Sequence, residues 1–145
     1  LATAPYHWAG DHADMGEIVY RGFDTRMNGP DVTYGQVSAL ERWLDQLPSL
    51  RVAPLDSGAV ERGAAVYAEQ SCASCHDVSA DPLSTALRGI QAPVLIGAGT
   101  RAPYFHDGCA ATLADAVAPG APCAPDHPSV SGDQAGDVAA YLEQL

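Results

Sequence analysis

Two cysteines and a histidine stand close together near the middle of the chain, in the order Cys72-Ala73-Ser74-Cys75-His76. A C-x-x-C-H run is typical of covalent c-type heme attachment. Residues three positions apart lie on one face of a helical turn, so both sulfurs can reach the vinyl groups of one porphyrin. The next residue places an imidazole under the iron as proximal ligand. We therefore predict one covalent heme c, held by Cys72, Cys75 and His76.

The motif has two other interpretations, a thioredoxin-like redox pair and half of a zinc site. A redox pair is expected in a βαβ context, which no pattern around the motif suggests. A zinc site needs a second cysteine pair at ligand spacing, whereas thirteen residues separate Cys109 from Cys123. Heme attachment is therefore favoured. Because cysteines are joined to heme outside the reducing cytoplasm, it also predicts a periplasmic or otherwise exported protein.

Cys109 and Cys123 remain once the heme is attached. An even remainder in an oxidising compartment favours a disulfide. A bridge across a loop of this size stabilises a fold by about 3 kcal/mol on the chain-entropy model. The alternative is a pair of free, buried thiols.

Apolar residues recur at helical spacing in four stretches, and capping boxes precede the last two. Pro48 ends the first stretch, and a Pro- and Ser-containing linker follows at 48–57. Ser57 is the predicted cap of the second stretch, which leads into the heme motif. The four predicted helices cover 36–47, 57–70, 112–117 and 131–145. Helix, heme motif, long loop and closing helix form the order of a cytochrome c domain, so we predict an all-α fold.

An internal repeat sets the predicted domain organisation. Residues 4–19 align without gaps to residues 102–117, and six of the sixteen positions are identical. Chance similarity in an Ala-rich sequence is the alternative. We predict a partial second copy of the heme domain at 1–50, without an attachment motif, and the heme domain itself at 58–145.

Residues 58–145 resemble the C-terminal heme domain of the bacterial di-heme cytochrome c peroxidases, a superfamily that includes the MauG-like proteins. The resemblance rests on the helix before the heme motif and on the stretches 101–108, 112–117 and 141–145. Residues 5–10 are similar to the Trp-Asp-Gly element that follows the heme in the N-terminal domain of that family. Two family features are missing from this sequence, the N-terminal attachment segment and the usual distal Met after the 112–117 helix.

The sixth iron ligand of a c-type domain usually comes from the segment before the closing helix. There, the strong iron ligand is His127, four residues past Cys123. His106, Met27 and an open, five-coordinate iron are the alternatives. A second imidazole would favour low-spin iron and electron transfer, and the loss of a thioether ligand lowers the reduction potential.

Further side chains are candidates for contacts to the heme and its ligand. Arg88 and Arg101 flank the heme loop and are predicted to pair with the propionates, although solvated arginines are an equal alternative. His76 Nδ1 is expected to donate to a backbone carbonyl, for which the segment at 81–82 is a plausible source.

A second group of potential ligands lies near the N-terminus. His7, Asp11, His12 and Asp14 have the composition of a metal site. The alternative is a short acidic loop that is simply solvated.

The net charge of the chain limits the classes of partner that the protein can bind. The sequence has seven Lys and Arg and 18 Asp and Glu, which gives a formal net charge of −11. This field argues against nucleic acid and anionic membranes and favours a redox partner with a basic patch. No apolar run approaches the roughly 20 residues of a membrane span. No basic and then apolar leader opens the sequence, which we interpret as a mature or excised product.

Two classes of function follow. The first is an electron-transfer cytochrome c with one covalent heme, acting as the relay part of a di-heme peroxidase-like assembly whose second heme lies on a partner. The second is a peroxidase or MauG-like oxidase in which hydrogen peroxide meets an open ferric site. The resemblance implies two hemes for peroxidase activity, and one C-x-x-C-H supplies one, so the relay is favoured.

Overall fold

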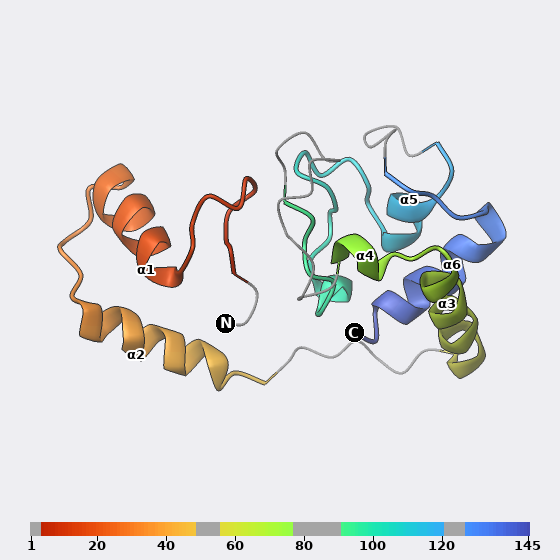
Figure 1. Cartoon of the computed structure of the whole chain (residues 1–145), viewed down its shortest axis with the longest axis horizontal. Helices are drawn as coiled ribbons and strands as arrows, with labels where there is room; N and C mark the ends of the chain where they lie inside the picture. Colours follow the sequence, from red (N-terminus) through yellow and green to blue (C-terminus); the bar gives the residue numbers. More distant parts are fainter. Residues whose placement is uncertain (1–3, 49–55, 77–90, 121–126) are drawn as a thin grey trace. The chain divides into compact units, whose positions relative to one another are not determined.

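The structure is a computed structural model that describes residues 4–48, 56–76, 91–120 and 127–145. Within these ranges the regular elements are helices, together with two isolated β-bridges, which confirms the predicted all-α class (Figure 1). The chain divides into two compact units. Unit 1 comprises Leu1–Pro48 and Asp81–Ala92, and unit 2 comprises Ser49–Ala80 and Pro93–Leu145. Among the described residues, no helix combines the length and hydropathy needed to cross a bilayer.

Unit 1 holds α1, the π-helix η1 that continues it, and α2. Their bounds are Met15–Glu17, Ile18–Arg26 and Tyr34–Asp45. In the described part of unit 2 lie four α-helices and the 3₁₀-helix η3. They are α3 Ser57–Glu69, α4 Ala73–His76, η3 Ala98–Thr100, α5 Leu113–Val117 and α6 Gly132–Leu142.

The ends of these helices follow from side-chain caps. The predicted capping boxes Thr112–Asp115 and Ser131–Gln134 are present at α5 and α6. The prediction that Ser57 caps α3 is wrong, because Asp56 Oδ1 accepts from Gly58 N at 2.9 Å and α3 starts at Ser57. These caps fix where α3, α5 and α6 start.

The start of α2 also differs from its predicted position. α2 begins two residues earlier than predicted, because Thr33 and Gln36 form a capping box that the apolar spacing did not show.

Unit 2 is built on the packing of α3 against α6, with α5 also packed on α6. The core beneath them is made of small and medium side chains, namely Val66, Ala98, Leu113, Val130, Ala135, Val138, Ala139 and Leu142. Gly63 on α3 faces Asp137 and Tyr141 on α6. A Cβ at Gly63 would overlap the Asp137 carbonyl oxygen, so the missing side chain is what lets the two helices meet this closely.

An exposed ion pair spans the same two helices. Arg62 donates from Nε to Asp137 Oδ2 at 2.8 Å and from Nη2 to Asp137 Oδ1 at 2.7 Å. This bidentate bond lowers the pKa of the Asp137 carboxyl below its ordinary value and raises that of Arg62. It ties α3 to α6, and α3 leads directly into the heme motif.

The two aligned sequence segments form the same kind of loop. Tyr6 and His12 pair as a β-bridge in unit 1, and Tyr104 pairs with Ala110 in unit 2. The residue after each tyrosine has a positive φ, 75° at His7 and 64° at Phe105. A glycine three residues later donates to that residue's carbonyl in both loops, at 3.0 and 3.2 Å.

The two units also correspond outside the aligned segments 4–19 and 102–117. At the same sequence offset, the Thr33–Gln36 capping box of α2 matches the Ser131–Gln134 box of α6. The apolar faces of the two helices differ in burial. Val37 on α2 and its match Ala135 on α6 are both buried, whereas Leu40 on α2 is 40% exposed and its match Val138 is buried.

Candidate heme site

The C-x-x-C-H motif lies on one helical turn that follows α3. Cys75 N and His76 N both bond to the carbonyl of Cys72, at 3.3 and 3.2 Å, and α4 spans Ala73–His76. Cys72 and Cys75 are free thiols, and burial raises the pKa of the Cys72 thiol. The turn therefore presents two reduced sulfurs next to an imidazole, which is the donor set that covalent heme attachment requires.

A backbone carbonyl orients the His76 ring. His76 Nδ1 lies 2.7 Å from the oxygen of Pro93, to which the Nδ1–H donates. This bond leaves Nε2 unprotonated and free to bind iron, and it makes the imidazole a stronger donor. The predicted donation is therefore present, but the segment at 81–82 was the wrong source. A carbonyl can come from any loop, and the sequence carries no local signal for which loop folds back onto the ring.

Arg101 supports the loop that carries Pro93. Its Nη2 donates to the carbonyl of Val94 at 2.6 Å and to that of Ile96 at 3.0 Å. The side chain thus ties together two carbonyls of the backbone that follows the His76 partner. This role was not predicted from the sequence.

His127 lies opposite His76. The two ring centroids are 6.1 Å apart, with an interplanar angle of 57°. An imidazole nitrogen binds a metal at about 2 Å, and the ring centre lies about 1 Å behind it, so two imidazoles on opposite sides of one ion would have centroids about 6 Å apart. The observed separation would therefore suit one heme iron held between His76 and His127.

The surroundings of His127 also suit a ligand. Its Nδ1 is buried and finds no hydrogen-bond partner within the described part of the chain. Burial, and next the neighbouring His76, lowers the pKa of His127, which favours the neutral imidazole. Neutral imidazole is the form that binds metal ions. The residues present therefore fit a heme held between two histidines.

Phe105 packs against His127. The two rings meet edge to face, with centroids 5.5 Å apart and planes at 79°. Phe105 belongs to the loop closed by Tyr104 and Ala110, and the Tyr104 hydroxyl donates to the Ala98 carbonyl at 2.9 Å. The repeat in the sequence pointed to this loop, but not to the contact between Phe105 and His127.

Residues 60–145, more than half of the chain, match the cytochrome c family. The chain belongs to the cytochrome c family. It accordingly carries covalent heme c and serves heme-based electron transfer with a redox partner, and the heme motif of this cytochrome c domain is Cys72, Cys75 and His76. No curated protein and no solved structure matches the chain.

The sequence also predicts further heme contacts, a disulfide and alternative iron ligands. Arg88 and Cys123 lie outside the described residues. Cys109 is bonded in a disulfide, and its pairing with Cys123 stays a prediction. His106 is exposed in the loop of Phe105. Met27 is 74% exposed in unit 1. Propionate pairing by either arginine likewise stays a prediction.

Proposed function

We propose that the cytochrome c domain holds its heme between His76 and His127 and works as an exported electron relay rather than as a peroxidase. The observation that carries this proposal is the 6.1 Å separation of the two imidazole rings. Iron with an imidazole on each side has no free position for hydrogen peroxide. When bound, the heme supplies reversible one-electron chemistry.

The protein would keep both ligand side chains in fixed positions when the iron changes its oxidation state. The Pro93 carbonyl fixes the ring plane of His76 from one side. Phe105 packs against His127 on the other side and keeps the ring from rotating. Ligands that are held by hydrogen bonds and packing move little between the two redox states, which favours fast electron transfer.

Unit 1 supports the idea of a partner that carries a second heme. It repeats the loop and the capped helix of the cytochrome c domain, but residues 1–56 contain no C-x-x-C-H motif. In unit 2, the α6 face is covered by the helix that leads to the heme. We infer that the corresponding face of α2, with Leu40 and Trp43, receives a heme-bearing helix of the same kind.

Met27 has a defined role in this proposal. It stands in the segment before α2, as His127 stands in the segment before α6, and it is 74% exposed. We infer that its thioether serves a second heme carried by the partner. A thioether ligand raises the reduction potential above that of a two-imidazole heme. The proposed assembly thus passes electrons between two hemes of different potential.

Replacing His127 by alanine tests the proposed ligand. The wild-type ferric protein is expected to give a low-spin spectrum, and its reduced form should not change when CO is added, because both axial positions are filled. The His127→Ala variant is expected to show a high-spin ferric band and to bind one CO per heme after reduction. The measurement is the absorption spectrum with and without dithionite and CO.

His106→Ala is the matched control for the His127 variant, because it removes the competing imidazole and should leave the low-spin spectrum unchanged. CO binding by the wild-type protein would contradict the proposal. Peroxide turnover by the wild-type chain well above that of free heme would also contradict the proposal, and it would favour the peroxidase function.

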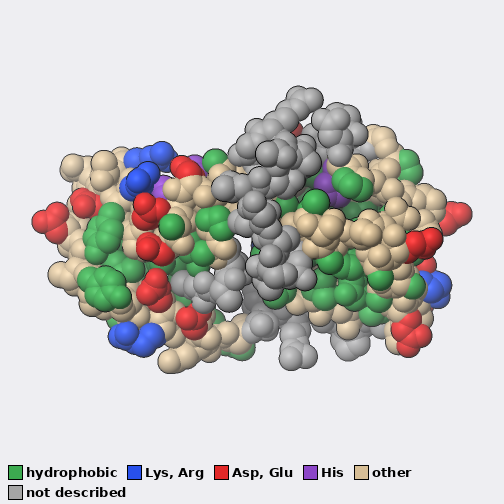
Figure 2. All heavy atoms as spheres, viewed as in Figure 1, with side chains coloured by type: hydrophobic (Ala, Val, Ile, Leu, Met, Phe, Trp, Pro, Cys, Tyr) green, Lys and Arg blue, Asp and Glu red, His purple; other side chains and the backbone are tan. Residues whose placement is uncertain are grey.

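The acidic surface predicts salt-dependent association with the electron-transfer partner. The net charge is −11, and Figure 2 shows more acidic than basic side chains on the face in view. Attraction to a basic partner accelerates encounter and is screened by salt. Electron transfer to a small basic c-type cytochrome should slow by about tenfold or more between low salt and roughly 0.5 M salt. A rate that does not depend on ionic strength in stopped-flow measurements would refute the basic-partner idea.

A further inference from the structure

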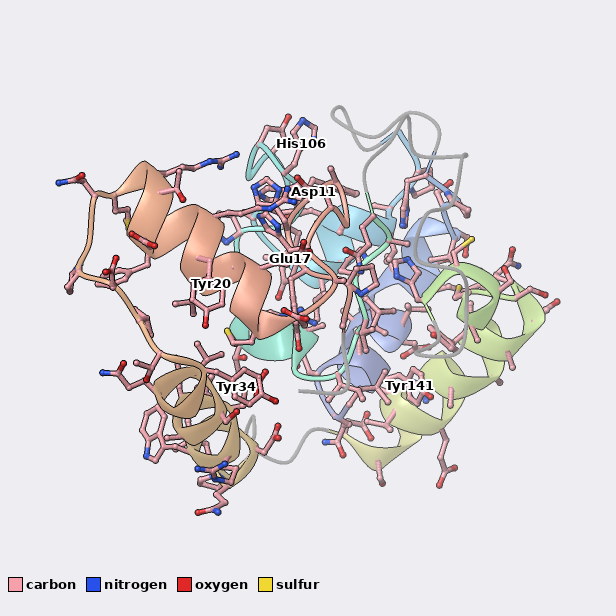
Figure 3. The ribbon with its side chains drawn as sticks, turned by 60° about the vertical axis from the view of Figure 1, so that its left-hand side comes forward. Asp11, Glu17, Tyr20, Tyr34, His106 and Tyr141 are labelled. Carbon is pink, nitrogen blue, oxygen red and sulfur yellow. The ribbon has the colours of Figure 1, made fainter. Side chains whose placement is uncertain are left out.

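Three potential ligands meet in the first loop of unit 1. His7, Asp11 and His12 each offer a nitrogen or oxygen ligand atom, and these atoms all lie within 4.8 Å of one another. Figure 3 places Asp11 beside an imidazole in the loop before α1. The β-bridge between Tyr6 and His12 closes this loop and brings its two ends together. The heme site uses none of these three side chains.

His12 supplies an observation that is independent of the cluster itself. It is 5% exposed, and its Nδ1 is buried without a hydrogen-bond partner in the described part of the chain. A buried ring nitrogen without a partner is costly, and native structures usually satisfy it. Its own loop brings two further donors next to it. A bound cation would supply the missing partner.

His7 and Asp11 complete the arrangement from the solvent side. His7 Nδ1 lies 2.7 Å from Asp11 Oδ1, and the side chains are 41% and 46% exposed. The His7 and His12 ring centroids are 5.2 Å apart. A metal ion can replace the proton shared by His7 and Asp11 with small side-chain rotations, because ligand bonds of about 2 Å put neighbouring donors roughly 3 Å apart.

We propose that His7, Asp11 and His12 bind one divalent cation of the zinc type. Two imidazoles and one carboxylate are ligands that zinc and its neighbours in the first transition row prefer, whereas calcium and magnesium prefer oxygen ligands alone. Three protein ligands leave a fourth position for water, and the exposure of His7 and Asp11 gives the ion a path to the site.

The corresponding loop of unit 2 has the same backbone arrangement but carries different side chains, so the loop fold does not require this ligand set. The positions that match His7, Asp11 and His12 are Phe105, Cys109 and Ala110. At the position of Asp11, unit 2 has a cysteine that is bonded in a disulfide. That disulfide ties the loop of unit 2 to a cysteine outside the loop, whereas the matching position in unit 1 carries one of the three proposed ligands.

Calorimetric titration with zinc chloride tests the site. The heme-loaded chain is used, so that His76 and His127 are occupied, and it is first dialysed against a chelator. One zinc ion per chain is expected to bind. His7→Gln and Asp11→Asn should each weaken binding at least tenfold, and both positions are exposed enough for the variants to fold. Asp31→Asn removes an exposed charge from the same unit and should leave the affinity unchanged.

Two results would overturn the proposal. One is the absence of saturable zinc binding up to millimolar concentration. The other is an affinity that stays the same in the His7→Gln, Asp11→Asn double variant. The far-UV circular dichroism of every variant is recorded as well, and an unchanged helical signal shows that a loss of zinc binding did not come from unfolding of unit 1.

Discussion

Replacing Cys72 and Cys75 by serine is expected to abolish covalent heme attachment completely. Both thiols are free and lie on one turn with His76, and serine cannot form the thioether bonds to the porphyrin. Each single variant should keep one thioether bond. The measurement is heme staining on a denaturing gel, together with extraction of the heme into acidified organic solvent. The double variant should release all of its heme, and the wild-type protein should release none.

The second cysteine pair provides the matched control for this experiment. A Cys109→Ser, Cys123→Ser double variant also removes two sulfurs, but it should keep its heme through denaturation, since Cys109 is bonded in a disulfide and is not available for attachment. Heme that stays bound on the gel in the Cys72, Cys75 double variant would show that the attachment site is elsewhere.

The loss of the heme is also expected to unfold unit 2. Among the described residues, the buried apolar cluster of unit 2 consists of Ala and Val with two leucines. A ligand that binds the folded state alone stabilises it by mass action, and a covalent ligand stays at a high effective concentration. We therefore expect the double variant to lose most of the helical circular dichroism of unit 2, while the control variant keeps it.

The sequence was sufficient where the determining signal is local. The heme motif, the capping boxes at Thr112 and Ser131, and the all-α class each depend on residues within a few positions of one another. The helical turn at Cys72 needs only its own backbone bonds. A local pattern of this kind does not depend on the tertiary structure, so the element it forms can be predicted without knowing the fold.

The sequence failed where distant segments meet. The Pro93 carbonyl at His76 and the Phe105 ring at His127 bring together parts of the chain that carry no common pattern. The close approach of α3 to α6 at Gly63 likewise has no signal in the sequence, because a glycine within a helical pattern does not show which helix packs against it. Such contacts are decided by packing, which a periodicity does not encode.

Gly63→Ala is expected to destabilise unit 2 strongly. A Cβ at this position would overlap the carbonyl oxygen of Asp137 and lie 2.9 Å from the Tyr141 Cβ, so α3 and α6 would have to move apart. A clash with backbone cannot be relieved by a change of rotamer. Overpacking of this kind costs about 1–3 kcal/mol, out of a total stability of roughly 5–15 kcal/mol for a domain. The measurement is the free energy of unfolding by denaturant, followed by circular dichroism.

Gly136→Ala separates this clash from the general effect of alanine in a helix. Gly136 lies within α6, and no atom stands within 4 Å of the position that a Cβ would take there, so the substitution meets open space. Alanine is favoured over glycine inside a helix by about 1 kcal/mol, and Gly136→Ala should therefore stabilise the protein. Opposite signs for the two substitutions mean that the contact between α3 and α6 determines the result. A stabilising Gly63→Ala would mean that the helices are not packed as closely as the heme-bearing turn requires.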